Sequence, residues 1–199
     1  RDYNYPSAVI DAKAAADYLA GLETVDGGNL GVMGWSQGGT DALLAAEAHP
    51  GTFQAVVTWS GALELNGASL FAGTSFEDAY AQAKKEGFYT MTFDWREPLE
   101  LGERWFQEVA ETNILKVTAD IKAPILAING KDDTTVTPDN AEKIVKAAAN
   151  ADSQLLLVDN CDHTYNVFSG DFTALYQTVD ATAAFFQAQL IPAAAQAAA

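Results

Sequence analysis

The sequence predicts an α/β protein whose mostly parallel sheet is covered by helices on both faces. Short, continuously apolar segments alternate with longer segments of helical character, which is typical of buried parallel strands joined by helices. The long connection at residues 62–120 breaks this alternation, because two neighbouring strands rarely need so many residues between them. We therefore expect a core formed by residues 1–61 and 121–199, with residues 62–120 inserted as a cap.

Length and composition fit this architecture and exclude several classes of protein. The chain has 199 residues, 49% of them hydrophobic, and a formal net charge of −16. Such an acidic surface argues against binding nucleic acid, because a phosphate backbone needs a basic partner. No apolar run approaches the roughly 18 residues of a membrane span. One cysteine and two histidines leave little for a metal site. We expect no metal, and no organic cofactor is required for the function inferred below.

Helices are predicted where alanine-rich or amphipathic segments lie between start and stop signals. The first follows Pro6 and ends at Gly21, and the second ends at His49 and Pro50. The core helices are expected at residues 7–20, 37–48, 139–150 and 172–190. Strands are predicted at four short apolar segments, many of them rich in β-branched residues. These are residues 30–34, 53–60, 124–129 and 154–158.

The inserted segment, residues 62–120, is rich in aromatic side chains. It holds nine of the 21 aromatic residues of the chain in under a third of its length. We expect helices at residues 76–86 and 101–116. Two interpretations stay open: an insertion with its own small core, and a lid that lines a substrate pocket.

The sequence Gly34-Trp35-Ser36-Gln37-Gly38 has the form G-x-S-x-G between a predicted strand and a predicted helix. This context is typical of a nucleophile elbow, in which a tight turn projects the serine hydroxyl above the sheet. The backbone amide of Gln37, at the start of the helix, then faces the place where an oxyanion would form. The alternative is a glycine-rich turn whose serine only caps the helix.

A serine hydroxyl needs a neighbouring base, and the chain has two histidines. His49 ends the helix that Ser36 begins, about 18 Å away at 1.5 Å per residue, so it is too distant. His163 follows the strand at residues 154–158, in a loop that reaches the same edge of the sheet as Ser36. We therefore predict that His163 is the base.

The base in turn needs a carboxylate, and the loop after the strand at residues 124–129 supplies two. Asp132 and Asp133 are both candidates for the group that orients the imidazole. Asp162, next to His163, is better explained as a loop aspartate. With either acid the chain order is Ser, Asp, His.

These motifs identify the sequence as resembling the α/β-hydrolases over nearly its whole length. The segment GVMGWSQGG is similar to the elbow of dienelactone-hydrolase-like esterases, although serine rather than cysteine at position 36 argues against dienelactone hydrolysis. The run from Gly87, with the segments APILAINGKDDTTVTPDNAEKI and LLLVDNCDHTYNVF, resembles bacterial cinnamoyl (feruloyl) esterases. The loop is similar to a G-x-x-D-x-x-V-x-P pattern, which favours Asp133 as the acid.

The resemblance implies a pocket for an aromatic acyl group beneath the inserted segment. Its candidate substrate contacts here are Trp35, Tyr89 and Trp95. Trp35 has an alternative role in packing the core.

The chain departs from the family pattern before the elbow. Several strands and a His-Gly pair that donates a second oxyanion amide are expected there, and this sequence has neither. At about 30 residues for each strand–helix–strand unit, roughly 70 to 100 residues are missing from the pattern. We therefore expect the missing segment or a second chain to cover an open edge of the sheet.

The favoured function is that of a serine carboxylester hydrolase (EC 3.1.1) that acts on a small-molecule ester through an acyl-enzyme. The alternatives are a serine peptidase of the prolyl-oligopeptidase type, which shares the fold and the chain order, and a non-catalytic module without a complete oxyanion hole.

Overall fold

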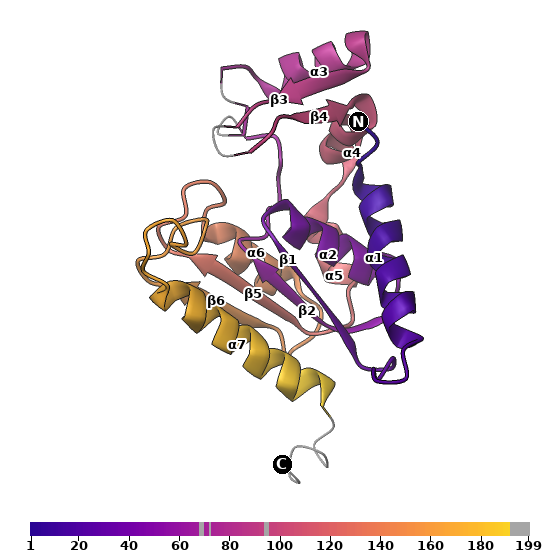
Figure 1. Ribbon diagram of the computed structural model, residues 1–199, viewed down its shortest axis with the longest axis vertical. Helices are drawn as coiled ribbons and strands as arrows, with labels where there is room; N and C mark the ends of the chain where they lie inside the picture. The colour runs from indigo at the N-terminus through magenta and orange to yellow at the C-terminus, as the bar shows by residue number, and fades with distance from the viewer. Residues whose placement is uncertain (68–69, 72, 94–95, 192–199) are drawn as a thin grey trace.

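The computed structural model describes residues 1–67, 70–71, 73–93 and 96–191. Its centre is a sheet of four parallel strands in the order β1-β2-β5-β6 (Figure 1). The strands are β1 (Leu30–Trp35), β2 (Phe53–Trp59), β5 (Ile125–Gly130) and β6 (Gln154–Val158). The chain therefore has the predicted α/β fold with a parallel sheet.

Helices cover both faces of the sheet. On one face lie α1 (Tyr5–Ala20), α2 (Gln37–Ala48), α5 (Ile114–Asp120) and α6 (Asp139–Ala147), whereas α7 (Thr173–Leu190) crosses the other face (Figure 1). Alternate residues of a strand face the two helical layers. Val56 packs on the α2 side of the sheet, and its neighbours Ala55 and Val57 pack on the α7 side. A strand buried on both faces must be apolar throughout, which explains the continuous apolar runs in the sequence.

The inserted segment has more regular structure than the sequence predicts. It contains α3 (Phe76–Glu86), α4 (Glu103–Glu111) and an antiparallel hairpin of β3 (Phe88–Met91) and β4 (Leu99–Gly102). The predicted single helix over residues 101–116 is wrong. Its first two residues belong to β4, and the chain is extended at Thr112 before the Asn113 side chain caps α5.

Aromatic side chains pack together inside the inserted segment. Trp105 and Phe106 of α4 meet Phe71 and Phe76, which are also buried. We call the residues joined by these ring contacts the aromatic cluster: Phe71, Phe76, Tyr80, Tyr89, Trp105 and Phe106. The aromatic cluster belongs to the same buried hydrophobic cluster as the α2 face of the sheet, and α5, the last helix of the segment, packs on α2 and α6 beside the sheet.

Strand β1 lies at one edge of the sheet, with β2 as its one neighbouring strand among the described residues. Met33 and Trp35 on this strand are 45% and 42% exposed. Ile10 and Tyr18 of α1 and Tyr176 of α7 add exposed apolar area on helices of both faces. In the described part of the chain, every helix is too short or too polar to cross a membrane.

Candidate active site

Ser36 lies in a strained turn between β1 and α2. Its backbone has φ 55° and ψ −124°, a combination that costs energy in any residue other than glycine. The turn is so tight that a Cβ on Gly34 would lie 1.9 Å from the carbonyl oxygen of Gly38. Gly34 is therefore a steric requirement of the turn, as the motif predicted, whereas a Cβ on Gly38 would have no atom within 4 Å.

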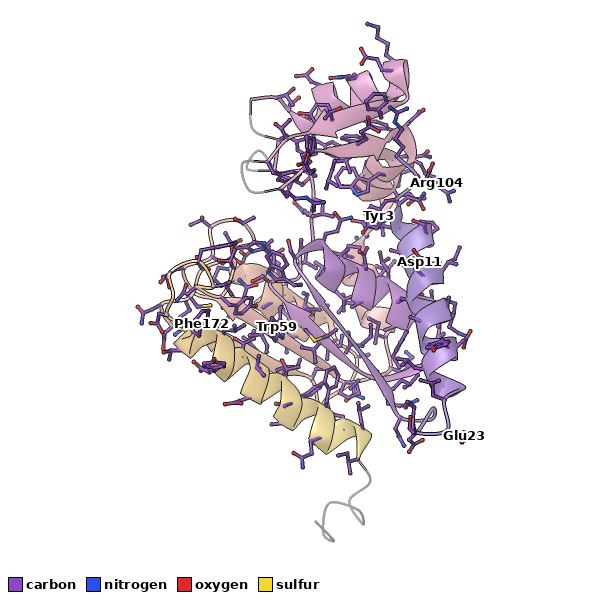
Figure 2. All side chains as sticks on the ribbon, in the orientation of Figure 1. Tyr3, Asp11, Glu23, Trp59, Arg104 and Phe172 are labelled. Atoms are coloured by element: carbon purple, nitrogen blue, oxygen red, sulfur yellow. The ribbon has the colours of Figure 1, made fainter. Side chains whose placement is uncertain are left out.

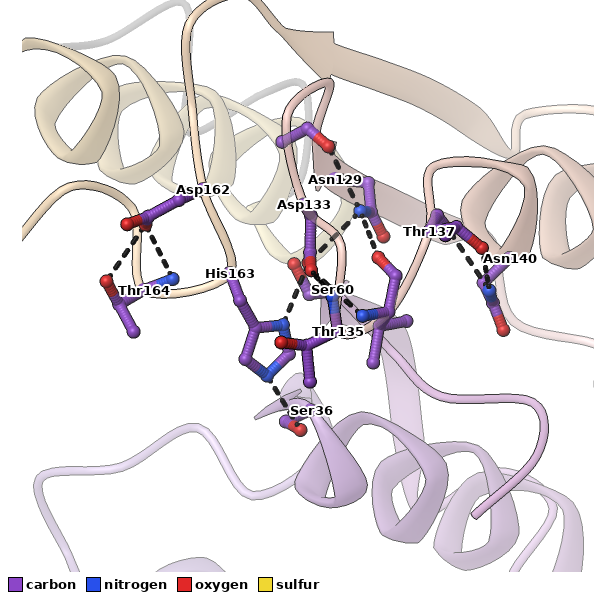
Figure 3. Close-up of polar contacts among 12 residues, drawn as sticks. Ser36, Ser60, Asn129, Asp133, Thr135, Thr137, Asn140, Asp162, His163 and Thr164 are labelled. Atoms are coloured by element: carbon purple, nitrogen blue, oxygen red, sulfur yellow. Dashed lines mark hydrogen bonds and ion pairs between the residues drawn. The ribbon is translucent and has the colours of Figure 1, made fainter. Parts of the chain in front are cut away.

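The Ser36 hydroxyl is not used to cap the helix that follows it. It makes no hydrogen bond to the first turn of α2. Instead, its Oγ lies 3.1 Å from Nε2 of His163 (Figure 3). The alternative of a simple helix cap is therefore wrong for this serine.

His163 and Asp133 come from separate loops and meet beside Ser36. The Nδ1 atom of His163 lies 2.8 Å from Oδ2 of Asp133 (Figure 3). With Nδ1 protonated and donating to this carboxylate, Nε2 is free to accept a proton from the serine. The structure thus brings the three predicted side chains into one hydrogen-bonded line.

The Asp133 carboxylate is buried and held by several donors. Burial alone would raise its pKa, but hydrogen bonds from His163, the Val136 amide and Ser60 outweigh it and lower the pKa below the usual value. The backbone amides of Thr135 and Val136 each donate to Oδ1 over 2.9 Å. The site therefore keeps an ionised carboxylate behind the imidazole.

The other two aspartates of these loops do not reach the imidazole. Asp132 is exposed, and its amide donates to the carbonyl of Cys161. Asp162 is also exposed, and it accepts from the amides of Thr164 and Asn166, which folds the loop that carries His163. Asp133, the acid that the sequence favoured over Asp132, is the one in contact with His163.

The predicted substrate contacts occupy different places. The Trp35 Nε1 donates to the backbone carbonyl of His163 over 2.9 Å, and the two rings lie 5.2 Å apart. Tyr89 is half-buried and contacts Phe71 and Phe106 in the aromatic cluster. Trp95 lies outside the described residues.

The side chain of Gln37, at the start of α2, belongs to a second group of hydrogen-bonded side chains. The Gln37 side chain donates to the hydroxyl of Tyr3, which donates to Asp41. Tyr3 stands at the start of the chain, between α1 and the inserted segment (Figure 2). Burial raises the pKa of Asp41 to about 6, and its second carboxylate oxygen has no hydrogen-bond partner among the described residues.

A cavity of about 630 Å³ opens between the start of the inserted segment, the α4–α5 junction and the loop after Asp133. Thr135 and Val136 belong to its wall, as do Leu63, Asn113 and Asn140. Neither Ser36 nor His163 lines it. In the described part of the chain, no three histidine, cysteine or carboxylate side chains are grouped as metal ligands.

Three residues around the line of Ser36, His163 and Asp133 were not predicted from the sequence. Asn129, fully buried in β5, donates to Asp133 and to the carbonyl of Val136. Ser60 and Tyr165 lie behind the carboxylate and are also buried. For Asn129 and Ser60 the signal in the sequence is weak, a single polar residue within or directly after an apolar strand, and Tyr165 lies in a loop without even that signal.

The sequence profile of the prolyl oligopeptidase family matches residues 7–191. The chain belongs to this family, and it is therefore a serine hydrolase of the α/β-hydrolase type. No curated protein sequence matches it significantly.

Solved structures support the fold. Est1E from Butyrivibrio proteoclasticus, in a structure with bound ferulic acid, is 18% identical with a TM-score of 0.73 over 96% of this chain and 71% of that chain. A monoacylglycerol lipase from Paleococcus ferrophilus is 17% identical, with a TM-score of 0.69 over 94% and 76%. A puromycin-hydrolyzing peptidase from Mycobacterium tuberculosis is 24% identical, with a TM-score of 0.61 over 92% and 25%.

Proposed function

We propose that this protein is a serine carboxylester hydrolase that works through an acyl-enzyme. The observation that carries the proposal is the line of contacts from Ser36 to His163 and from His163 to Asp133, at 3.1 and 2.8 Å, on a strained turn. These are the contacts that a nucleophile, its base and the orienting acid require.

In the acylation step, Nε2 of His163 accepts the proton of Ser36 while Oγ attacks the ester carbonyl carbon. The Gln37 backbone amide donates to the resulting oxyanion. The ionised Asp133 stabilises the imidazolium that forms. When the tetrahedral intermediate collapses, the carbon–oxygen bond to the alcohol breaks, and His163 returns its proton to the leaving oxygen.

In the deacylation step, His163 takes a proton from water, and the hydroxyl attacks the acyl-enzyme. Collapse of the second intermediate releases the carboxylic acid, and Ser36 regains its proton from His163. Side chains of this chain perform each proton transfer, so the proposed reaction calls for no metal or cofactor.

We propose a bulky, aromatic acyl group as the substrate class. Two features support this choice: the aromatic inserted segment at residues 62–120, and a fold shared with Est1E, whose structure holds ferulic acid. Most rings of the aromatic cluster pack against one another within the segment. The half-buried Tyr89 is the member we assign to substrate contact, with Trp35 beside the imidazole and Trp95 as further candidates.

A peptidase is the second candidate, and the family match favours it directly. The puromycin-hydrolyzing peptidase shares the fold, although this chain covers only 25% of it. The same three side chains would serve amide hydrolysis, with His163 protonating an amine instead of an alcohol. A non-catalytic module is the third candidate, because losing one of two oxyanion donors costs about 10²- to 10³-fold in rate.

The experiment that tests these candidates starts with a fluorophosphonate and intact-mass measurement. An adduct of one per chain that is lost in Ser36→Ala supports a reactive serine, whereas a folded protein without an adduct supports the non-catalytic module. Matched substrates then compare the esters and amides of the same acyl groups, cinnamoyl, acetyl and prolyl. Faster turnover of cinnamoyl ester than of any amide supports the proposal, and the reverse order supports the peptidase.

We also propose that the β1 edge is covered in the functional protein, either by a further polypeptide segment or by a second copy of the chain. The exposed Met33 and Trp35 on this edge strand support the proposal. Light scattering coupled to size exclusion separates a dimer from a monomer, and the mass spectrum reveals a bound second polypeptide. A monomer without any bound polypeptide contradicts it.

A further inference from the structure

Tyr165 anchors the loop that carries His163. It lies two residues after the imidazole, is 2% exposed, and packs its ring on Trp59 with centroids 5.1 Å apart. Its backbone has φ 55°, a conformation that is unfavourable for a bulky side chain. The Tyr165 hydroxyl lies 3.3 Å from both the carbonyl oxygen of Ile128 and Oγ of Ser60, and it can donate its one proton to either.

Ser60 connects this anchor to the acid. It follows β2 with φ 46°, is fully buried, and donates its amide to the carbonyl of Ile128 over 2.7 Å. Its hydroxyl is among the hydrogen-bonding groups that lower the pKa of Asp133. A serine hydroxyl has one proton, and the contact with Asp133 uses it. The Ser60 oxygen then accepts from Tyr165, so the hydroxyls form a chain from the His163 loop to the Asp133 carboxylate.

We propose that Tyr165 and Ser60 are positioning residues that fix the His163 loop and the Asp133 carboxylate relative to one another. The inference rests on the proposed function, since it assigns the two hydroxyls a role in holding its base and acid. Neither side chain touches the reacting atoms. Their effect passes through the contact between Nδ1 of His163 and Oδ2 of Asp133, which joins two loops that are 30 residues apart.

The alternative is that Tyr165 only fills space below the loop. A phenylalanine would fill nearly the same space, so removal of the hydroxyl alone separates packing from positioning. Buried hydroxyls cost free energy unless they are hydrogen-bonded, and here both hydroxyls have polar partners on the ends of β2 and β5 or on the Asp133 loop. The positioning role therefore belongs to the hydrogen bonds of the two hydroxyls and not to the packing of the Tyr165 ring.

The test uses Tyr165→Phe, Ser60→Ala and the double variant, with Tyr176→Phe as the control. Tyr176 lies on α7 and is 64% exposed. Two readouts are measured: the rate of Ser36 modification by a fluorophosphonate, and the downfield proton resonance of the His163–Asp133 hydrogen bond. We expect each single variant to react about tenfold more slowly, and the double variant about as slowly as either single one, because the hydroxyls act in one chain. The resonance should broaden or move upfield in all three.

Wild-type rates with an unchanged resonance would overturn the proposal, and so would losses that multiply in the double variant. If Tyr165→Phe has a lower melting temperature but both site readouts are unchanged, Tyr165 contributes only to packing. If Tyr165→Phe does not fold, Ser60→Ala carries the same test. A wild-type protein that does not react would contradict the proposed function, and the proton resonance would still decide whether the two hydroxyls hold the imidazole against the acid.

Discussion

The carboxyl edge of the sheet and the inserted segment are organised by different forces. At the sheet edge, the side chains that meet are polar, and their positions depend on unusual backbone: Ser36, Ser60 and Tyr165 all have positive φ. In the inserted segment, the aromatic cluster is joined by ring contacts around the buried Trp105 and Phe106.

The difference shows where each region is sensitive to change. Directional hydrogen bonds and strained turns tolerate little displacement, so a substitution at the sheet edge should alter chemistry more than stability. Aromatic packing is less directional, so a substitution in the cluster should alter stability and the fit of a substrate more than the reactivity of the serine.

The largest expected effect is the loss of reaction in Ser36→Ala. Removal of the nucleophile should lower kcat by about 10⁴- to 10⁶-fold and abolish the fluorophosphonate adduct. Stability should hardly change, since the Ser36 hydroxyl does not cap α2. Ester turnover, intact mass and the melting temperature check this, and turnover that persists in the variant would assign the reaction to another group.

A matched pair of neighbouring aspartates gives the next largest effect. Asp133→Asn should lower kcat by about 10⁴-fold, because the amide favours the wrong imidazole tautomer. Asp132→Asn should leave kcat nearly unchanged, since that carboxylate is exposed and does not contact His163. Equal losses in the two variants, measured on one ester, would contradict the assignment of Asp133.

The core strands, Ser36 and His163 could be predicted because each has a local signal. An apolar run, a glycine on each side of a serine, and a histidine directly after a strand are all visible without tertiary information. Asp133 was favoured over Asp132 only by the likeness of the loop to a family pattern, because no local signal shows which carboxylate the loop turns inward. Likewise, Ser60 and Tyr165 meet across 105 residues, and no pattern along the chain encodes that distance.

The hairpin of β3 and β4 was missed for a similar reason. Each strand has only four residues, and their pairing depends on contact with the aromatic cluster rather than on alternation in the sequence. The break between α4 and α5 does have a signal, since Asn113 is a favourable N-cap. The residues on both sides of Asn113 have a helical composition, so one continuous helix was predicted across this break.

Trp105→Ala probes the inserted segment. The side chain is 1% exposed, and its removal should lower the free energy of unfolding by about 3–5 kcal/mol through the cavity it leaves. Thr90→Ala, at an exposed position of β3, is the control and should change little. Denaturant melts measure stability, while fluorophosphonate labelling of folded protein should proceed at the wild-type rate. Loss of labelling in folded Trp105→Ala would show that the two regions are not independent.

The smallest expected effect concerns Asp41, whose pKa is raised to about 6 by burial. Because this value lies above that of the unfolded chain, the protonated carboxyl stabilises the fold, and this stability is lost as the pH rises from about 4 through about 6. Relative to Asp41→Asn, whose amide cannot ionise, the wild-type protein should lose about 2 kcal/mol over that range. Urea melts of both proteins between pH 4 and 7 measure the difference. Parallel curves would contradict the prediction. They would also mean that Tyr3, which donates to this carboxylate, offsets its burial more fully than the raised pKa implies.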